Sequence, residues 1–161
     1  GLLDKWAVHL GGGLTHRLTR TDAIMIKEND LAAMTDLEQS NDQVIAKLIQ
    51  TLDPETTGSF IEIEVRNEKE ALTAAAVWQQ THNKSETKLV IMLDNFGPEK
   101  CRDVVNQLSN MSLRDSVLLE ASGNITFDKL DDWFECGIDV ISTSAVNRGV
   151  KPLDISMIMG D

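Results

Sequence analysis

The stretch Leu89-Val90-Ile91-Met92-Leu93-Asp94 is an apolar run that ends in a carboxylate and is followed by a helical pattern. Such a run is typical of a strand buried on both faces of a parallel sheet. Similar runs recur along the chain and predict strands at 23–26, 61–65, 89–93, 117–119 and 139–141. Helical periodicity predicts helices at 2–10, 35–51, 68–81, 98–109 and 127–136. Because strands and helices alternate, we expect an α/β fold built from parallel βα units.

Chemically active side chains stand at the carboxyl ends of these predicted strands. In strand order they are Lys27, Glu64, Asp94, Glu120 with 122–123, and 142–144. A barrel brings all its strand ends to one mouth, whereas an open doubly wound sheet gathers only those beside its switch point. We therefore expect a parallel (β/α) barrel. We also expect it to be incomplete at its N-terminal end, because no strand precedes the helix at 2–10.

Composition narrows the class of function. The 161 residues fit one domain, and an apolar content of 42% is enough for a substantial core. The net charge of −11 argues against a nucleic-acid partner, which would need a basic surface. No apolar run reaches the length of a membrane span, and Cys101 and Cys136 are too few and too far apart for a zinc cluster. These features predict a cytoplasmic protein with two buried, reduced thiols.

Positive charge is concentrated near the start of the chain. His16 and Arg17 follow the glycine run 11–13, and Lys27 comes directly after the first strand. Flexible backbone beside basic side chains suits an anionic ligand, although a helix stop and a solvated loop are the simpler alternatives. Any anion site in so acidic a chain must be local.

Acidic residues occupy the next two strands. Glu62 and Glu64 alternate with apolar residues, so both should point to one face of the sheet. The two faces of a barrel strand are the packed lumen and the helix layer, and at least one of the two carboxylates should sit at the mouth. Asp94 ends the following strand, where a helix N-cap is the competing interpretation.

Small residues follow the last two strands. The loops are Ser122-Gly123-Asn124 and Thr143-Ser144-Ala145. Open backbone N–H groups next to a helix start can hold a phosphate, and barrels commonly bind phosphate after their last strands. A tight βα turn is the simpler alternative for each loop.

Taken in order, these motifs resemble one family, the quinolinate phosphoribosyltransferases, also called carboxylating nicotinate-nucleotide pyrophosphorylases. The resemblance covers nearly the whole chain and rests on the following segments: 1–8, 11–13, 15–17, 26–29, 62–65, 93–95, 120–126, 137–142 and 153–156. Each motif is modest alone, but their joint order and spacing are specific. Asp30, Asn124 and Ser144 depart from the family pattern, in which histidine, glycine and glycine are usual.

The resemblance implies that quinolinate and phosphoribosyl pyrophosphate are converted to nicotinate mononucleotide, pyrophosphate and carbon dioxide with Mg²⁺, in NAD biosynthesis. It implies a catalytic set of Lys27, Glu64 and Asp94, with Glu64 and Asp94 facing the ribose and holding Mg²⁺ indirectly through pyrophosphate. His16, Arg17 and Lys27 are expected to bind the carboxylates of quinolinate. Ser122, Gly123, Asn124, Thr143, Ser144 and Ala145 are expected to bind the 5′-phosphate.

The resemblance also implies features beyond these residues. The family has an Arg-Lys-Thr strand and an N-terminal domain upstream, so we expect residues 1–161 to be the catalytic barrel without that domain. It suggests a homodimer or larger homo-oligomer for the full-length protein. Two alternatives stay open: a related phosphoribosyltransferase associated with molybdenum transport, and a phosphate-binding fragment without catalysis. Lys27-Glu28-Asn29 favours the quinolinate enzyme over the first.

Overall fold

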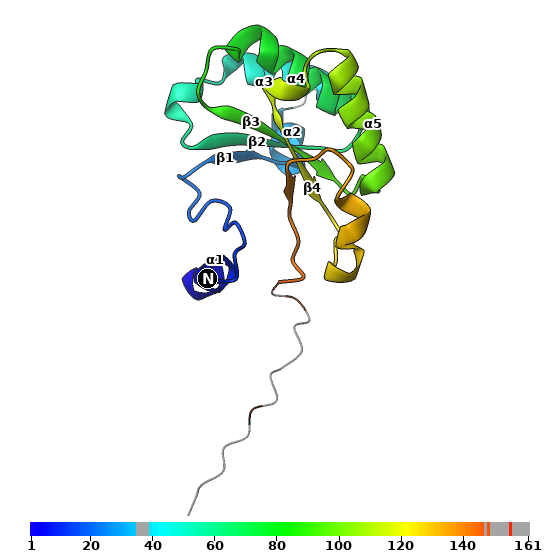
Figure 1. The fold of residues 1–161 in the computed structure, drawn as a ribbon. Helices are drawn as coiled ribbons and strands as arrows, with labels where there is room; N and C mark the ends of the chain where they lie inside the picture. The colour runs from blue at the N-terminus through cyan, green and yellow to red at the C-terminus, as the bar shows by residue number, and fades with distance from the viewer. Residues whose placement is uncertain (35–38, 147, 149–154, 156–161) are drawn as a thin grey trace, which may run out of the picture.

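The computed structural model describes residues 1–34, 39–146, 148 and 155 (Figure 1). The helices are α1 (Leu2–Leu10), α2 (Glu28–Met34), α3 (Asn41–Thr51), α4 (Glu68–His82) and α5 (Gly97–Asn110). The strands are β1 (Ile24–Ile26), β2 (Phe60–Val65), β3 (Lys88–Asp94), β4 (Leu118–Ser122) and β5 (Val140–Ile141). Three 3₁₀ helices complete the secondary structure of this part of the chain: η1 (Pro54–Thr56), η2 (Arg114–Ser116) and η3 (Phe127–Trp133).

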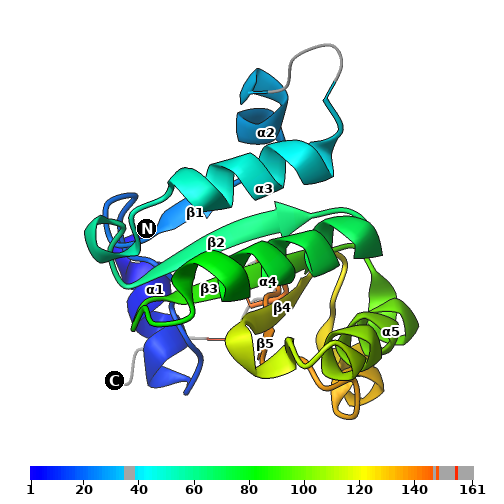
Figure 2. The same cartoon turned by 90° about the horizontal axis from the view of Figure 1, so that it is seen from above.

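The five strands form one parallel sheet in the unbroken order β1-β2-β3-β4-β5. Helices α3, α4 and α5 lie together over one face of this sheet (Figures 1 and 2). A doubly wound sheet reverses its strand order and carries helices on both faces, whereas a barrel wall adds each strand beside the last. The order therefore confirms the predicted α/β fold and matches part of a parallel barrel.

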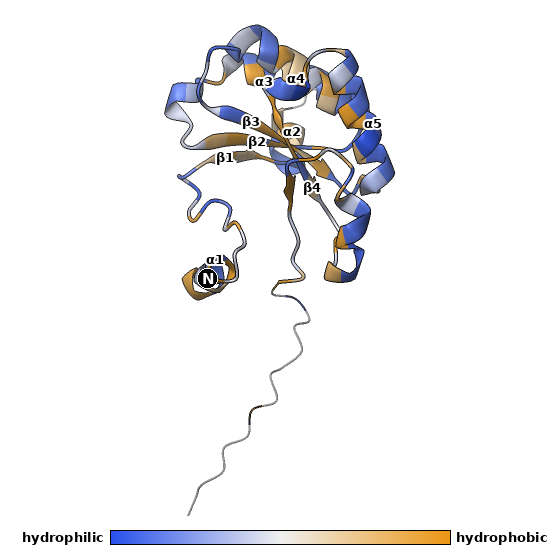
Figure 3. Cartoon of the chain, in the orientation of Figure 1, coloured by the Kyte–Doolittle hydropathy of each residue, from blue (hydrophilic) through white to orange (hydrophobic). Residues whose placement is uncertain are grey.

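The pleat of the sheet separates an apolar face from a polar one. Ile61, Ile63, Ile91 and Leu119 are fully buried in the core beneath the helices. In Figure 3 much of each strand is orange, the colour of hydrophobic residues. The residues that alternate with these along each strand form the opposite, inner face. On that face, strand pairing places Glu64 beside Met92 and Met92 beside Glu120. It also places Met25 beside Glu62. The alternation expected for Glu62 and Glu64 is confirmed.

Most predicted elements are confirmed, with differences at boundaries. The predicted helix at 35–51 begins as α3 at Asn41, because Ser40 and Gln43 form a capping box there; 35–38 lie outside the described residues. The sequence patterns do not predict the short helix α2, which Asp30 caps by accepting a hydrogen bond from Lys27 N at 2.9 Å. Asp30, a departure from the family pattern, therefore has a local structural role.

Two further predictions need correction. β4 continues through Ser122 instead of ending at 119, because residues 120–122 keep pairing with β3, and Glu120 is buried there at 3% exposure. The predicted helix 127–136 is the 3₁₀ helix η3. Its inward side chains Leu130 and Trp133 are three residues apart, which suits three residues per turn. Of the motif 153–156, only Ile155 belongs to the described residues.

Helix α1 lies on the other side of the sheet from α3, α4 and α5 (Figure 1). It buries no residue, and Leu2, Leu3 and Trp6 are largely exposed. Lys5 links α1 to the segment that follows it, because its Nζ donates to Thr15 O at 2.9 Å and also to Arg17 O. Helix α1 thus contacts the basic segment, residues 15–17, directly.

Both cysteines are buried free thiols, as predicted. Burial raises the pKa of Cys101 to about 12. Within the described ranges, none of the helices combines the length and apolarity needed to cross a bilayer.

Candidate active site

Lys27 and Glu64 meet at the carboxyl ends of β1 and β2. Lys27 follows the last residue of β1, and its Nζ lies 3.3 Å from Glu64 Oε2. Glu64 is nearly buried, with 13% of its side chain exposed, whereas Lys27 is half exposed at 52%. The structure therefore brings together two of the three residues expected to be catalytic, with the lysine facing outward.

Asp94 ends β3 two residues beyond the level of Glu64 and pairs in register with Ser122. Its Oδ2 accepts a hydrogen bond from Asn95 Nδ2 at 2.8 Å. The competing N-cap interpretation is wrong for α5, because that helix begins at Gly97 and its N-cap is Phe96. Asp94 therefore stays at the strand end, in register with Ser122, the last residue of β4.

The loop 122–124 is tied to Asn95. Asn95 N donates to Ser122 O at 2.8 Å, and Asn124 Nδ2 donates to Asn95 Oδ1 at 3.0 Å. Asn95, Gly123 and Asn124 all have positive φ, at 58°, 97° and 54°. Asparagine tolerates this region better than most residues, which explains how Asn124 replaces a glycine of the family pattern.

The second expected phosphate loop follows β5 and is held to the first. Thr143 Oγ1 donates to Ile125 O and accepts from Ala145 N at 3.0 Å. Ser144 O accepts a hydrogen bond from Arg148 N at 2.8 Å. The two loops are therefore neighbours, and the Ala145 N–H is already occupied in this structure.

His16 and Arg17 lie deeper, at the level of Met25 and Glu62. His16 Nε2 donates to Glu62 Oε2 at 2.6 Å, and its ring meets the Phe60 ring edge to face at 5.3 Å. Arg17 Nη1 donates to Ala23 O at 2.9 Å, and Nη2 approaches Met25 Sδ at 3.7 Å. The basic residues thus occupy two levels of the inner face, with Lys27 above His16 and Arg17.

Sequence reasoning did not assign roles to Glu62 and Glu120. Both are buried, at 0% and 3% exposure, and each has an Oε1 with no hydrogen-bond partner among the described residues. The side-chain atoms of His16, Glu62 and Glu120 that could bind a metal ion lie within 4.8 Å of one another, so these three groups have the spacing of metal ligands. The sequence did contain a signal for both residues: each is a carboxylate flanked by apolar residues inside a strand. A carboxylate buried in this way needs a partner.

This cluster changes the proton affinity of its members. The hydrogen bond to Glu62 raises the pKa of His16, and the negative charges of Glu62 and Glu120 act in the same direction. Burial raises the pKa of Glu120, and the nearby Glu62 carboxylate adds to the increase. The deep level of the inner face therefore favours a protonated imidazole against two acidic side chains.

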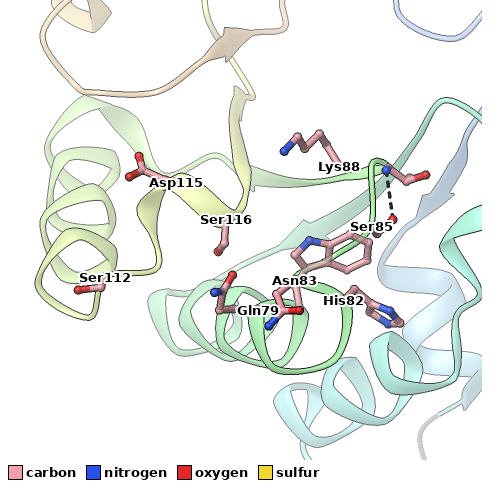
Figure 4. Close-up of a pocket in the computed structure, with 10 residues that line it drawn as sticks. Gln79, His82, Asn83, Ser85, Lys88, Ser112, Asp115 and Ser116 are labelled. Atoms are coloured by element: carbon pink, nitrogen blue, oxygen red, sulfur yellow. Dashed lines mark hydrogen bonds between the residues drawn. The ribbon is translucent and has the colours of Figure 1, made fainter.

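A polar pocket opens at the other end of the sheet, beside Lys88 at the start of β3 (Figure 4). His82, Ser112 and Asp115 help to line it, but none of the residues expected to bind substrate does so. In parallel barrels the chemistry gathers at the carboxyl ends of the strands. We therefore place the candidate site at the mouth around Glu64 and Asp94.

Comparison with known proteins identifies the family. The family model of the quinolinate phosphoribosyl transferase C-terminal domain matches residues 1–158. The chain belongs to this family.

Relatives of the quinolinate phosphoribosyltransferase family agree with this. A probable carboxylating nicotinate-nucleotide pyrophosphorylase of Methanothermobacter thermautotrophicus is 31% identical, with 96% of this chain and 50% of the relative covered. The chloroplastic enzyme of Arabidopsis thaliana is 33% identical, with 97% and 44% covered. The solved nicotinate-nucleotide pyrophosphorylase of Francisella tularensis has a TM-score of 0.67 at 29% identity, covering 93% of this chain and 46% of that one. The chain spans about half the length of these relatives.

Proposed function

We propose that the protein is a quinolinate phosphoribosyltransferase, transferring phosphoribose from phosphoribosyl pyrophosphate to quinolinate with loss of carbon dioxide. The observation that carries this proposal is the ion pair of Lys27 and Glu64 at the strand ends of a family member, with Asp94 at the end of the next strand. Lysine offers a point charge to a carboxylate, and the two acids suit a ribose that becomes positive. The relatives are named as carboxylating nicotinate-nucleotide pyrophosphorylases, and that activity fits this arrangement.

In the proposed reaction, the nitrogen of quinolinate attacks the anomeric carbon of the ribose as the bond to pyrophosphate breaks. Arg17, His16 and Lys27 hold the dianionic ring in line. Glu64 and Asp94 stabilise the positive charge that develops on the sugar. No covalent enzyme intermediate is needed, because both reactants are held in one mouth.

The 5′-phosphate is assigned to Ser122–Asn124 and Thr143–Ala145. The positive φ values of Gly123 and Asn124 support this, since such turns expose backbone N–H groups. Ala145 would have to exchange its bond to Thr143 Oγ1 for one to phosphate.

Mg²⁺ is the proposed cofactor. Glu64 and Asp94 present carboxylates on one face, two residues apart in register, and this hard oxygen set fits magnesium pyrophosphate. When bound, Mg²⁺ would neutralise charge on the leaving pyrophosphate. A cytoplasmic location and a homodimer or larger homo-oligomer are part of the same proposal.

The direct test is formation of nicotinate mononucleotide from quinolinate, phosphoribosyl pyrophosphate and Mg²⁺ by the natural full-length protein. Lys27→Met should lower kcat/KM for quinolinate by about 10- to 100-fold, the scale of one charge-assisted contact. Lys84→Met, a change at an exposed loop lysine, is the matched control and should leave turnover unchanged. No product from the unmodified protein would exclude the proposed function.

A further inference from the structure

His16 is held in an uncommon backbone conformation within the basic segment. Its φ of 52° lies in the left-handed region, which a non-glycine residue adopts only where its surroundings favour it. The contacts that compensate for this conformation come from opposite sides of the segment.

The first contact is on the backbone. Lys5 of α1 extends its ammonium group to the carbonyl oxygens of Thr15 and Arg17, the residues on either side of His16. Helix α1 buries none of its own residues. Lys5 is thus a connection between this exposed helix and the turn, made from outside the sheet.

The second contact is on the ring. Glu62 is fully buried in β2 and accepts from His16 Nε2 at 2.6 Å, while Phe60 of the same strand packs its ring edge to face with the imidazole. A strand in the middle of a sheet is rigid, so these contacts fix the direction of the imidazole ring. Glu120 adds a second buried carboxylate within 4.8 Å of the pair.

We propose that Lys5 and Glu62 are positioning residues, which hold the turn Thr15-His16-Arg17 from two sides so that His16 and Arg17 face a dicarboxylate ligand. Neither residue needs to touch the ligand. This proposal rests on the proposed function for the identity of the ligand, but the geometry of the turn can be tested without it.

The charge of Glu62 makes the proposal easy to distinguish from a general electrostatic effect. A carboxylate near an anion site repels the anion, so removing the charge alone would lower KM for quinolinate. Loss of positioning has the opposite effect and raises KM for quinolinate. The direction of change in a variant without an acceptor therefore decides between the two.

The experiment compares Glu62→Leu, Glu62→Gln and Lys5→Met in the natural full-length protein, with Lys84→Met as the control. Glu62→Leu and Lys5→Met should each raise KM for quinolinate about tenfold, with kcat changed less than about threefold. Glu62→Gln keeps an acceptor for His16 and should return KM to the unmodified value or below. Lys5→Met changes no buried residue, so it remains informative if Glu62→Leu does not fold.

Nuclear magnetic resonance of the same variants gives the second readout. The nuclear Overhauser contact between the His16 and Phe60 rings should disappear in Glu62→Leu and persist in Glu62→Gln. If the unmodified protein makes no product, the proposed function fails while this ring contact still tests positioning. A retained ring contact with unchanged or lower KM in Glu62→Leu would overturn the inference. Stoichiometric Zn²⁺ binding that is lost in both His16→Asn and Glu120→Gln would also overturn it, because His16 would then serve as a metal ligand.

Discussion

Gly123 and Asn95 approach so closely that a Cβ on Gly123 would lie 2.3 Å from Asn95 Oδ1. The amide of Asn95 is also the acceptor for Asn124. The loop after β4 thus packs against the residue that follows Asp94, with no room for a side chain between them. This contact couples the expected phosphate loop to the expected acidic site.

Gly123→Ala should lower the free energy of unfolding by about 2–4 kcal/mol, because it adds both overpacking and left-handed strain. Gly12→Ala is the matched control: Gly12 has φ +85°, but a Cβ added there would meet no atom of the described residues within 4 Å. That change should cost only about 1–2 kcal/mol. Urea unfolding of the two variants measures the difference, and equal losses would contradict the close approach.

Glu64→Gln should reduce kcat by about 10²-fold while changing the binding of phosphoribosyl pyrophosphate less, because its charge is needed most as the ribose becomes positive. It also removes the ionic partner of Lys27. Single-turnover kinetics and calorimetric titration separate the two effects. A loss confined to binding would show that Glu64 acts only on the ground state.

Stability should fall as pH rises through the neutral range. The folded state binds protons more tightly than the unfolded state at His16 and Glu120, whose pKa values are both raised. The His16 contribution is fully present below its ordinary pKa of 6.5 and is lost as pH passes the higher folded value. For Glu120 the loss begins above its ordinary pKa of 4.5.

Chemical denaturation between about pH 5 and 9 checks this slope. His16→Asn should flatten the part above the ordinary histidine pKa of 6.5, and Glu120→Gln should flatten the part that begins at lower pH. An unchanged slope in both variants would show that protonation of His16 and Glu120 does not cause the dependence of stability on pH.

Asp139→Ala should destabilise the β4–β5 edge. Asp139 Oδ2 accepts from the backbone N–H of Leu119 at 2.7 Å and pairs with Arg114 Nη2 at 2.7 Å. Removing the acceptor leaves a buried N–H unsatisfied, at a cost of about 1–3 kcal/mol. Asp139→Asn keeps an acceptor and should lose less. Hydrogen exchange at Ser142 N–H, bonded to Ala121 O, reports whether β5 detaches.

Much of the fold could be predicted because its signals are local. The apolar run 89–93 and the alternation around Glu62 and Glu64 depend only on neighbouring residues, and both appear as expected. The strand-end positions of Lys27, Glu64 and Asp94 followed from that assignment. Their binding and catalytic roles stay predictions until tested with ligands.

The partners of the buried groups could not be predicted. His16 contacts Glu62, which lies 46 residues further along the chain, and that contact depends on the path of the segment after α1. Lys5 and Arg17 set this path through backbone carbonyls, which the sequence of side chains does not reveal. The burial of Glu120 escapes prediction for a related reason: its carboxylate indicates the end of a strand that in fact continues past it.

The unbroken strand order has a consequence for how this site can change. Each strand delivers a different chemical group to the mouth: a lysine after β1, carboxylates on β2 and β3, and small-residue loops after β4 and β5. Because every group arrives on its own βα unit, mutation or insertion in one loop alters one group of the mouth while its neighbours keep their framework. Ligand preference can therefore diverge stepwise among descendants of a common ancestor, without the fold being rebuilt.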